Sequence, residues 1–383
     1  MKNRMISIIF GFLLLYVAIT LYIGWNGRVF WNTVFGPSTG WAFTTVWALL
    51  AYGYLAAMLL RRILPYPVYS AVKLIGTYGL GICMYALLSL PIADVAVALL
   101  RWSGMETSAA VSIVGWIVVL LIALVLAIGS RNAWSPVVRR YDIRIDKEAG
   151  PRKELRIAVA SDLHLGTTIG KPHLARLVER VQALQPDLVL LPGDVLDDSI
   201  EPFVRERMGE VLGRLSAPLG VYASLGNHEY IGGHIDEYVE RMKAIGIRVL
   251  LDEVVLVEDS FYVAGRKDAA VARVDKSGRL SVAELLKGTD PVVPVVLLDH
   301  QPRDFGTAAA AGADLMLSGH THRGQLMPGH LITRRMFELD WGYLRKEAMH
   351  VIVSSGFGFW GPPIRIGSRS EVLDIRVTFG REG

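Results

Sequence analysis

The 383-residue sequence has a single cysteine, Cys83, so it lacks the thiols for a disulfide framework or for a cysteine-rich metal site. It also lacks a basic and aromatic stripe on any recognised nucleic-acid-binding fold, and we expect no nucleic-acid partner. Charge is missing from long stretches of the first third of the chain, although the chain as a whole is 52% hydrophobic. That composition is too apolar for an ordinary soluble protein of this length.

Four runs without Asp, Glu, Lys, Arg or His predict four transmembrane helices. They cover residues 5–23, 41–60, 74–93 and 107–130, and each is long enough to cross a hydrocarbon core of about 30 Å. The first run exceeds the apolar region of a signal peptide, about 7–15 residues, and no small-x-small site closes it, so we favour a signal anchor. Because the runs carry no Asp, Glu, Lys, Arg or His, they offer no obvious ion or proton path and indicate an anchor.

The distribution of lysine and arginine predicts the orientation of these spans. In a four-span arrangement only Arg28 and Arg101 lie on one side of the membrane. The positive-inside rule therefore predicts an integral protein of the plasma (inner) membrane with both termini, and the domain that follows the last run, on the cytoplasmic side. The basic residues on that side are Lys2, Arg4, Arg61, Arg62, Lys73, Arg131, Arg139 and Arg140.

After residue 135 the sequence pattern changes to that of an α/β domain, which we expect to cover residues 136–383, with residues 1–135 forming the transmembrane region. "VVRRYDIRIDK" alternates as a first strand does, and short apolar runs typical of a sheet buried on both faces follow it. Between them, residues 172–184 and 235–245 have helical spacing. The apolar runs are "LRIAVAS", "DLVLLP", "GVYASLG", "VVPVVLLD" and "ADLMLSG".

Polar side chains follow nearly all of these predicted strands. Because the carboxyl ends of strands in an α/β sheet meet at the crevice where ligands bind, five separate segments deliver oxygen and nitrogen atoms to one region. Residues two apart in an extended segment point the same way, so two of the segments can each present a pair of side chains. The residues are Asp162, His164, Asp194, Asn227, His228, His300, His320 and His322.

Imidazole, carboxylate and amide groups without thiolate suit Mn, Fe, Zn or Ni. The set is too large for one four-coordinate ion, yet it fits two divalent ions that share a carboxylate and activate water for phosphoryl displacement, with hydroxide as the nucleophile. Taken singly, the acids have ordinary structural interpretations: Asp162 as a cap, and Asp194 with Asp197 and Asp198 as a solvated turn. Five blocks in one region favour the metal interpretation.

The blocks "DLH", "GD", "GNHE", "DHQP" and "GHTH", in that order, resemble the signature of the calcineurin-like metallophosphoesterase superfamily over residues 155–377. With four spans in front, the chain resembles the transmembrane, bacterial membrane-anchored branch. The resemblance implies a four-layer αββα sandwich around a dimetal centre, with Mn expected and Fe, Zn, Ni or Mg as alternatives. It makes Asp162, His164 and His322 ligands of the first metal, Asp194 the bridge, and Asn227, His300 and His320 ligands of the second.

The same resemblance places His228 near the phosphate, where it protonates the leaving oxygen or stabilises its charge. It gives Glu229 of "GNHE" a supporting position. Arg323 and Gln325, which follow the histidine pair, have two equal interpretations, contact with the substrate phosphate or a surface role. The histidines outside the blocks are assigned structural roles. They are His173, His234, His330 and His350.

Aromatic residues gather near the C-terminus among basic ones. They fit either a surface lying on anionic lipid or ordinary core packing. They include Phe337, Trp341, Tyr343, Phe357, Phe359 and Trp360.

Three functional hypotheses follow from different classes. The first is a membrane-anchored dimetal phosphoesterase or pyrophosphatase, with a lipid-linked substrate such as a UDP-diacylglucosamine favoured. The second is the same chemistry on a soluble nucleotide, with the spans only as an anchor. The third, a non-catalytic sensor or transporter, is disfavoured because no expected ligand is missing and the spans lack Asp, Glu, Lys, Arg and His. The net charge of +4 fits an anionic substrate or membrane surface.

Overall fold

The structure is a computed structural model that describes residues 2–276 and 278–380, with side chains from Ser7 onward. The side chains of Lys2 and Arg4, used above for orientation, lie outside the described residues. The chain divides into two compact units. One unit comprises residues Met1–Ser130 with Gly361–Ile364, and the other comprises Arg131–Trp360 with Arg365–Gly383. The boundary expected between residues 135 and 136 falls between the last long helix and the first strand.

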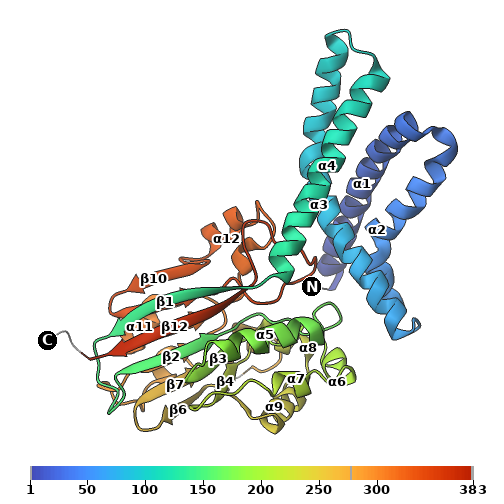
Figure 1. Cartoon of the computed structure of the whole chain (residues 1–383). Helices are drawn as coiled ribbons and strands as arrows, with labels where there is room; N and C mark the ends of the chain where they lie inside the picture. Colours follow the sequence, from blue (N-terminus) through green and yellow to red (C-terminus); the bar gives the residue numbers. More distant parts are fainter. Residues whose placement is uncertain (1, 277, 381–383) are drawn as a thin grey trace. The chain divides into compact units, whose positions relative to one another are not determined.

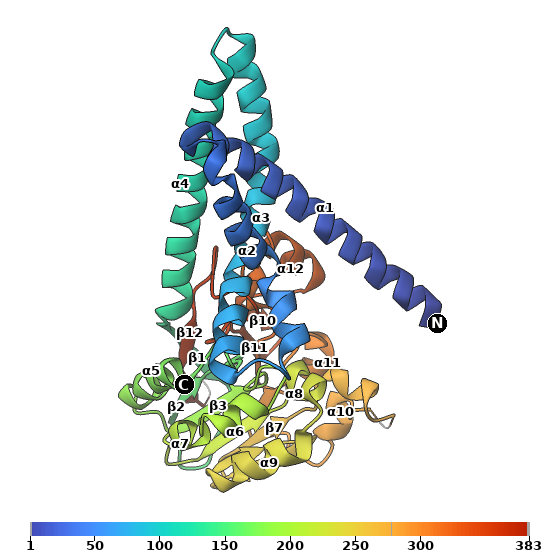
Figure 2. The same ribbon diagram turned by 90° about the vertical axis from the view of Figure 1, so that its right-hand side faces the viewer.

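The first unit is built from long apolar helices (Figure 2). Each helix contains one of the uncharged runs and extends beyond it, and four of them are long and apolar enough to cross a membrane. This confirms four apolar helices of membrane-spanning length at the predicted positions. Within the unit, α2 and α3 pack through small buried residues, which allow apolar helices to approach closely without a hydrophobic driving force in lipid. The helices are α1 (Lys2–Phe35), α2 (Gly40–Leu60), α3 (Tyr66–Trp102) and α4 (Thr107–Trp134), with η1 (Pro37–Thr39) between the first two.

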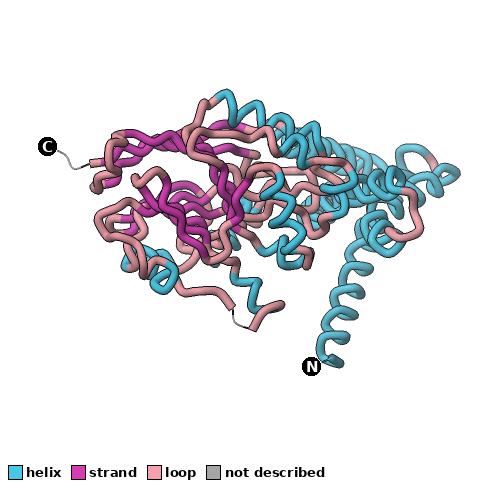
Figure 3. The backbone as a smooth tube through the Cα atoms, turned by 90° about the horizontal axis from the view of Figure 1, so that it is seen from below, coloured by secondary structure: helices cyan, strands magenta, loops and turns pink. Residues whose placement is uncertain are grey.

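The second unit contains two six-stranded sheets, drawn in magenta in Figure 3. The order of the first is β1 (Val137–Ile145), β12 (Glu371–Phe379), β2 (Glu154–Val159), β3 (Leu188–Pro192), β4 (Val221–Ser224) and β5 (Ile247–Val249). The order of the second is β10 (Gly342–Lys346), β11 (Met349–Val353), β9 (Leu315–Ser318), β8 (Val295–Leu298), β7 (Phe261–Gly265) and β6 (Glu253–Val257).

Helices cover the outer faces of both sheets. The first sheet carries α5 (Lys171–Ala183), α7 (Gly209–Leu212) and α9 (Ile235–Ala244), which Figure 1 shows beside β3 and β4. The second carries α10 (Val282–Leu285) and α11 (Phe305–Ala310). The remaining helices are α6 (Glu201–Arg205), α8 (Asn227–Gly232), α12 (His330–Met336), η2 (Ala269–Arg273) and η3 (His322–Gly324).

The continuous apolar runs explain this layering. In β3, Leu188 and Leu190 point into the core between the sheets, whereas Val189 and Leu191 point to the helices outside. Successive strand residues face opposite sides, so a strand covered on both faces has no position for a polar side chain. The four layers confirm the predicted fold class.

The sheets also fix where the polar strand ends meet. The strands β2, β3 and β4 are parallel neighbours in one sheet, and β7, β8 and β9 are parallel neighbours in the other. The carboxyl ends of each set therefore lie at one edge, where ligands bind in sheets of this kind.

Candidate metal centre

The structure brings all eight predicted site residues together at the ends of five strands. Asp162 and His164 follow β2, Asp194 follows β3, Asn227 and His228 begin α8 after β4. His300 follows β8, and His320 and His322 follow β9. Among the described residues, four sets have ligand atoms that all lie within 4.8 Å of one another: Asp162 with His164 and His322, His164 with Asp194 and His228, Asp194 with His300 and His320, and Asp197 with Asp198 and His228.

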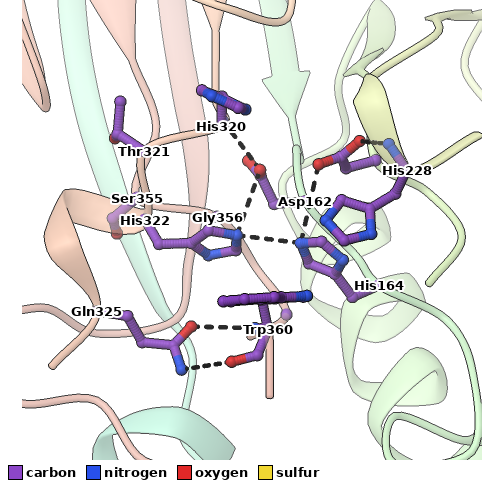
Figure 4. Close-up of polar contacts among 12 residues, drawn as sticks. Asp162, His164, His228, His320, Thr321, His322, Gln325, Ser355, Gly356 and Trp360 are labelled. Carbon is purple, nitrogen blue, oxygen red and sulfur yellow. Dashed lines mark hydrogen bonds and ion pairs between the residues drawn. The ribbon is translucent and has the colours of Figure 1, made fainter. Parts of the chain in front are cut away.

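The first group is centred on two imidazoles that face each other (Figure 4). The Nε2 atoms of His164 and His322 are 3.0 Å apart, and His322 Nε2 lies 3.5 Å from Asp162 Oδ1. Burial lowers the pKa of His164 to about 3 and holds the pKa of His322 well below its usual value. Both rings are therefore neutral at pH 7, which is the form that binds a metal.

Asp194 lies between the two groups. Its Oδ2 atom is 3.0 Å from His300 Nε2 and 4.0 Å from His164 Nε2. Burial alone would raise the pKa of Asp194, but the neighbouring histidines, led by His300, hold it well below its usual range. One ionised carboxylate thus faces a ring from each group.

The second group is formed by His300, His320 and Asn227. His320 Nδ1 lies 2.8 Å from Asn227 Oδ1. His300 Nδ1 lies 2.9 Å from the carbonyl of Pro192, to which it donates, so its Nε2 is the atom presented to Asp194. Burial lowers the pKa of His320 to about 3.

One buried atom tests whether this donor set fits a cation. Asp162 is fully buried, and its Oδ2 has no hydrogen-bond partner among the described residues. Burial raises the pKa of this carboxyl to about 6. A buried carboxylate oxygen without a partner is costly, whereas a divalent cation beside neutral imidazoles would stabilise it. The residues present therefore fit divalent metal binding.

The backbone around these side chains is strained. Asp162, His164, Asp194, His320 and His322 all have positive φ, between 47° and 70°, a conformation that costs about 1–2 kcal/mol for a residue with a Cβ atom. Such conformations aim side chains that an ordinary turn would direct elsewhere. The adjacent glycines are equally constrained, because a Cβ atom on Gly226 or Gly319 would collide with the carboxylate of Asp194 or Asp162.

His228 faces an acidic partner on its Nδ1 side. Its Nδ1 lies 2.7 Å from Asp198 Oδ1. Burial opposes charge on the ring, but the hydrogen bond to Asp198 and the charge of Asp194 outweigh it and raise the pKa of His228 to about 9. Asp198, which sequence analysis considered only as part of an acidic turn, is thus the partner of a predicted catalytic residue.

Glu229 has the supporting contacts that the resemblance implied. Its carboxylate accepts hydrogen bonds from the backbone N–H groups of Asp194, Leu196 and Gly226, at 3.1, 2.9 and 2.8 Å. It therefore ties the β3 and β4 loops together.

Sequence analysis missed Arg365. Its side chain is fully buried, and its Nη2 lies 3.0 Å from His322 Nδ1. The only signal was one arginine inside the apolar, proline-containing stretch "PPIRIG", which in a folded domain requires buried partners.

The side chains of Arg323 and Gln325 contact aromatic residues. The guanidinium carbon of Arg323 lies 3.8 Å from the ring centroid of Trp341. Gln325 binds both backbone groups of Trp360. In the aromatic stretch, Phe357 and Phe359 are buried as core packing predicts, whereas Trp360 is exposed. None of the four histidines outside the blocks belongs to the metal-binding groups found among the described residues.

Comparison with known proteins agrees with this geometry. Residues 155–324 match the calcineurin-like phosphoesterase family. An uncharacterized metallophosphoesterase of Aquifex aeolicus is 33% identical over 242 residues, covering 63% of this chain and 91% of that protein. A transmembrane protein with metallophosphoesterase domain from Danio rerio is 34% identical over 271 residues, covering 68% of this chain. The matched region spans 62% of the length of the Danio rerio protein.

A third relative has a more specific name. The UDP-2,3-diacylglucosamine pyrophosphatase LpxG of Chlamydia trachomatis is 24% identical over 296 residues, which cover 63% of this chain and 89% of that protein.

Proposed function

Because the chain belongs to the calcineurin-like metallophosphoesterase family, whose members are metal-dependent hydrolases, we propose that it is a membrane-anchored dimetal phosphoesterase acting on a lipid-linked substrate. The proposal assigns the first metal to Asp162, His164 and His322, and the second to Asn227, His300 and His320. Asp194 is the bridge between them. His228 is the acid that serves the leaving oxygen.

The position of Asp194 carries this assignment. A single oxygen, Oδ2, faces His300 of one group and His164 of the other. A carboxylate that bridges two ions needs this placement, and a single-ion site does not. The lowered pKa values keep the imidazoles of His164, His320 and His322 neutral and Asp194 ionised, and these are the protonation states that bind divalent ions.

When bound, a pair of divalent ions polarises the phosphoryl oxygens and lowers the pKa of water to supply the nucleophile. Manganese is the proposed ion, because the donors are nitrogen and oxygen without thiolate, and Fe, Zn, Ni and Mg are the alternatives for the same donors.

The protein's own acid is His228. Asp198 accepts from its Nδ1, which leaves the Nε2 proton for the oxygen that departs from phosphorus. The raised pKa keeps this proton in place at neutral pH, and a positioned acid of this kind accelerates such a step about 10²–10⁴-fold.

A lipid-linked substrate is supported by α12 as well as by the four apolar helices. Leu331, Ile332 and Met336 of α12 are 55–63% exposed, and the helix buries no residue. Its Thr333 hydroxyl donates to Asp340 Oδ2 at 2.7 Å, and the Asp340 carbonyl accepts from Thr321, which lies between the two histidines of "GHTH". Exposed apolar side chains tied to this turn suit contact with acyl chains near the phosphate.

We further propose that the protein lies in the plasma (inner) membrane, with the metal centre on the cytoplasmic side. The lysine and arginine distribution supports this orientation. A reporter fused to the C-terminus tests this orientation. A signal from outside the cytoplasm would show that the topology is the reverse of the proposed one.

Hydrolysis by the detergent-purified, Mn²⁺-loaded protein tests the function. The substrates are a diester and a monoester of p-nitrophenol, a soluble nucleotide pyrophosphate and a UDP-diacylglucosamine. We expect metal-dependent turnover that is fastest on the lipid. Asp194→Asn should abolish turnover and reduce bound metal, whereas the exposed Asp236→Asn should change neither.

Three outcomes would contradict parts of the proposal. No turnover of any substrate with two metals bound would contradict the enzymatic function and favour the non-catalytic sensor. Equal rates on soluble and lipid substrates would remove the lipid preference. Faster turnover of the soluble nucleotide would favour the second hypothesis, in which the helices only anchor the protein.

A further inference from the structure

Trp360 directly follows a buried segment beside the metal centre. Residues 351–359 are all buried, and the next residue, Trp360, is 58% exposed. The side chain of Trp360, directly after nine buried residues, therefore has apolar surface that is not covered by other residues. Its surroundings indicate what that surface contacts.

The backbone of Trp360 is held from the side of His322. Gln325 Nε2 donates to the Trp360 carbonyl at 2.8 Å, and the Trp360 N–H donates to Gln325 Oε1 at 3.0 Å, as Figure 4 shows. The backbone N–H of Gln325 in turn donates to the carbonyl of His322 at 3.0 Å. Trp360 is therefore fixed relative to a proposed metal ligand.

The preceding loop is held from the side of Asp162. The N–H of Phe357 donates to the Ser161 carbonyl at 2.9 Å, and the N–H of Gly358 donates to the Asp162 carbonyl at 2.8 Å. Phe357 also packs on the ring of His173, with centroids 4.5 Å apart. The loop that presents Trp360 is thus attached to both of the segments that carry the first group.

The exposed ring lies next to the proposed acid. The ring centroids of Trp360 and His228 are 6.3 Å apart, with an interplanar angle of 61°. His228 serves the oxygen that leaves phosphorus, so a non-ligating side chain beside it is placed to contact the group attached to that oxygen.

We propose that Trp360 binds a planar ring in the leaving group of the substrate, an aryl group or a nucleobase, by stacking. This inference rests on the proposed function of the metal centre. A rigid indole held at both backbone groups presents a flat surface without the entropy cost of ordering it on binding, and aromatic rings prefer offset-stacked or edge-to-face contact with such a surface. The inference adds a specificity-determining residue that is neither a metal ligand nor the acid.

Binding of two phosphonates to the full-length, Mn²⁺-loaded protein in detergent tests the inference without requiring turnover. Phenylphosphonate carries a ring and methylphosphonate does not. We expect calorimetry to give about tenfold tighter binding of phenylphosphonate to the wild type. Trp360→Ala should weaken the binding of phenylphosphonate alone and so bring the two affinities close together. Trp360→Phe should keep part of the preference for phenylphosphonate.

A second tryptophan provides the matched control. The ring of Trp341 is covered by the guanidinium groups of Arg139 and Arg323, so Trp341→Phe should leave the preference unchanged. An undiminished preference in Trp360→Ala would overturn the inference. An equal loss for both phosphonates would also overturn it, because Trp360 would then support the metal centre and not a ring.

Two further ligands distinguish the source of the ring. Uridine monophosphate and ribose phosphate differ by a base. If Trp360→Ala also removes a preference for the nucleotide, the ring is a base; if it affects only the phenyl pair, the ring is attached close to the phosphate. Failure of the wild type to bind any of the four would contradict the proposed function itself, and this inference with it.

Discussion

Arg365 Nη2 lies 3.0 Å from His322 Nδ1, and both side chains are buried. The same nitrogen donates to the carbonyls of Ser355 and Gly358, at 2.7 and 2.5 Å. One arginine therefore packs against a proposed metal ligand and holds the loop that carries Trp360. Burial lowers the pKa of Arg365 to about 10, so it stays charged at pH 7.

Replacing Arg365 should weaken metal binding. Lysine keeps the charge but cannot reach the ring and two carbonyls with one planar group. Arg365 holds the Ser355 and Gly358 carbonyls of the loop behind His322. Loss of such an outer contact typically costs about 10–100-fold in metal affinity, and we expect a loss of this size for Arg365→Lys in a Mn²⁺ titration. Arg369→Lys is the control, because Arg369 donates to the Ser135 carbonyl and not to a histidine. Equal affinities in wild type and Arg365→Lys would show that His322 needs no such partner.

Asp198→Asn should move the alkaline limit of activity to lower pH. The acid acts while protonated, so its rate falls as pH rises through its pKa, and Asp198 helps to raise the pKa of His228 to about 9. Without that carboxylate the pKa falls, and the rate of diester hydrolysis should drop more at pH 8 than at pH 6. A profile of kcat/KM against pH measures the shift.

Asp198→Glu provides the matched variant. It keeps a carboxylate near His228 and should restore part of the alkaline limb. An unchanged profile in Asp198→Asn would mean that His228 does not act as the acid.

The strands that were easiest to predict are those covered on both faces, because such strands contain only apolar residues. β3 and β8 are buried on both faces, and their sequences are continuous apolar runs. β5, β6, β7, β10 and β11 were not predicted. Of these, β5 and β6 are short, partly exposed and contain charged residues such as Arg248 and Glu253. The transmembrane helices were predicted but were expected to be shorter, since the absence of charge marks the apolar stretch and a helix can continue past it.

The site followed from sequence only where residues lie at strand ends. Asp162 and His164 are two residues apart after one strand, so their proximity required no knowledge of tertiary structure. Arg365 meets His322 only because the C-terminal loop folds over the Asp162 segment, a contact between residues 43 positions apart. The positive φ values at the site were not predictable either, because the surrounding packing imposes them on residues that do not favour them.

His173→Phe should change the response of stability to pH. Burial lowers the pKa of His173 from an ordinary value near 6.5 to about 4. The folded protein therefore binds the proton less well than the unfolded chain, and stability is lost as pH falls from about 6.5 to 4. At pH 5 the loss is about 2 kcal/mol. Phenylalanine fits the surrounding rings of Trp134, Phe357 and Phe359 and has no proton to bind.

Thermal unfolding in detergent at pH 7.5, 6 and 5 measures this difference. The melting temperature of His173→Phe should fall less than that of the wild type as pH decreases. His234→Phe is the control, because His234 is exposed and its replacement should leave the slope unchanged. Parallel slopes for wild type and His173→Phe would show that His173 is accessible to protons in the folded state.

The last prediction concerns α12 and separates lipid contact from chemistry. Leu331→Ser with Ile332→Ser removes exposed apolar side chains without touching the Thr333–Asp340 hydrogen bond that attaches the helix to Thr321. If acyl chains lie on this helix, the double variant should lose about tenfold or more in kcat/KM on a diacylated substrate, since burying one such side chain contributes about 1.5–3 kcal/mol. Diester hydrolysis should stay unchanged. Val274→Ser, at another exposed apolar position, should affect neither substrate. Equal losses of kcat/KM on both substrates would mean that α12 shapes the metal centre. No loss on either substrate would mean that the acyl chains do not contact α12.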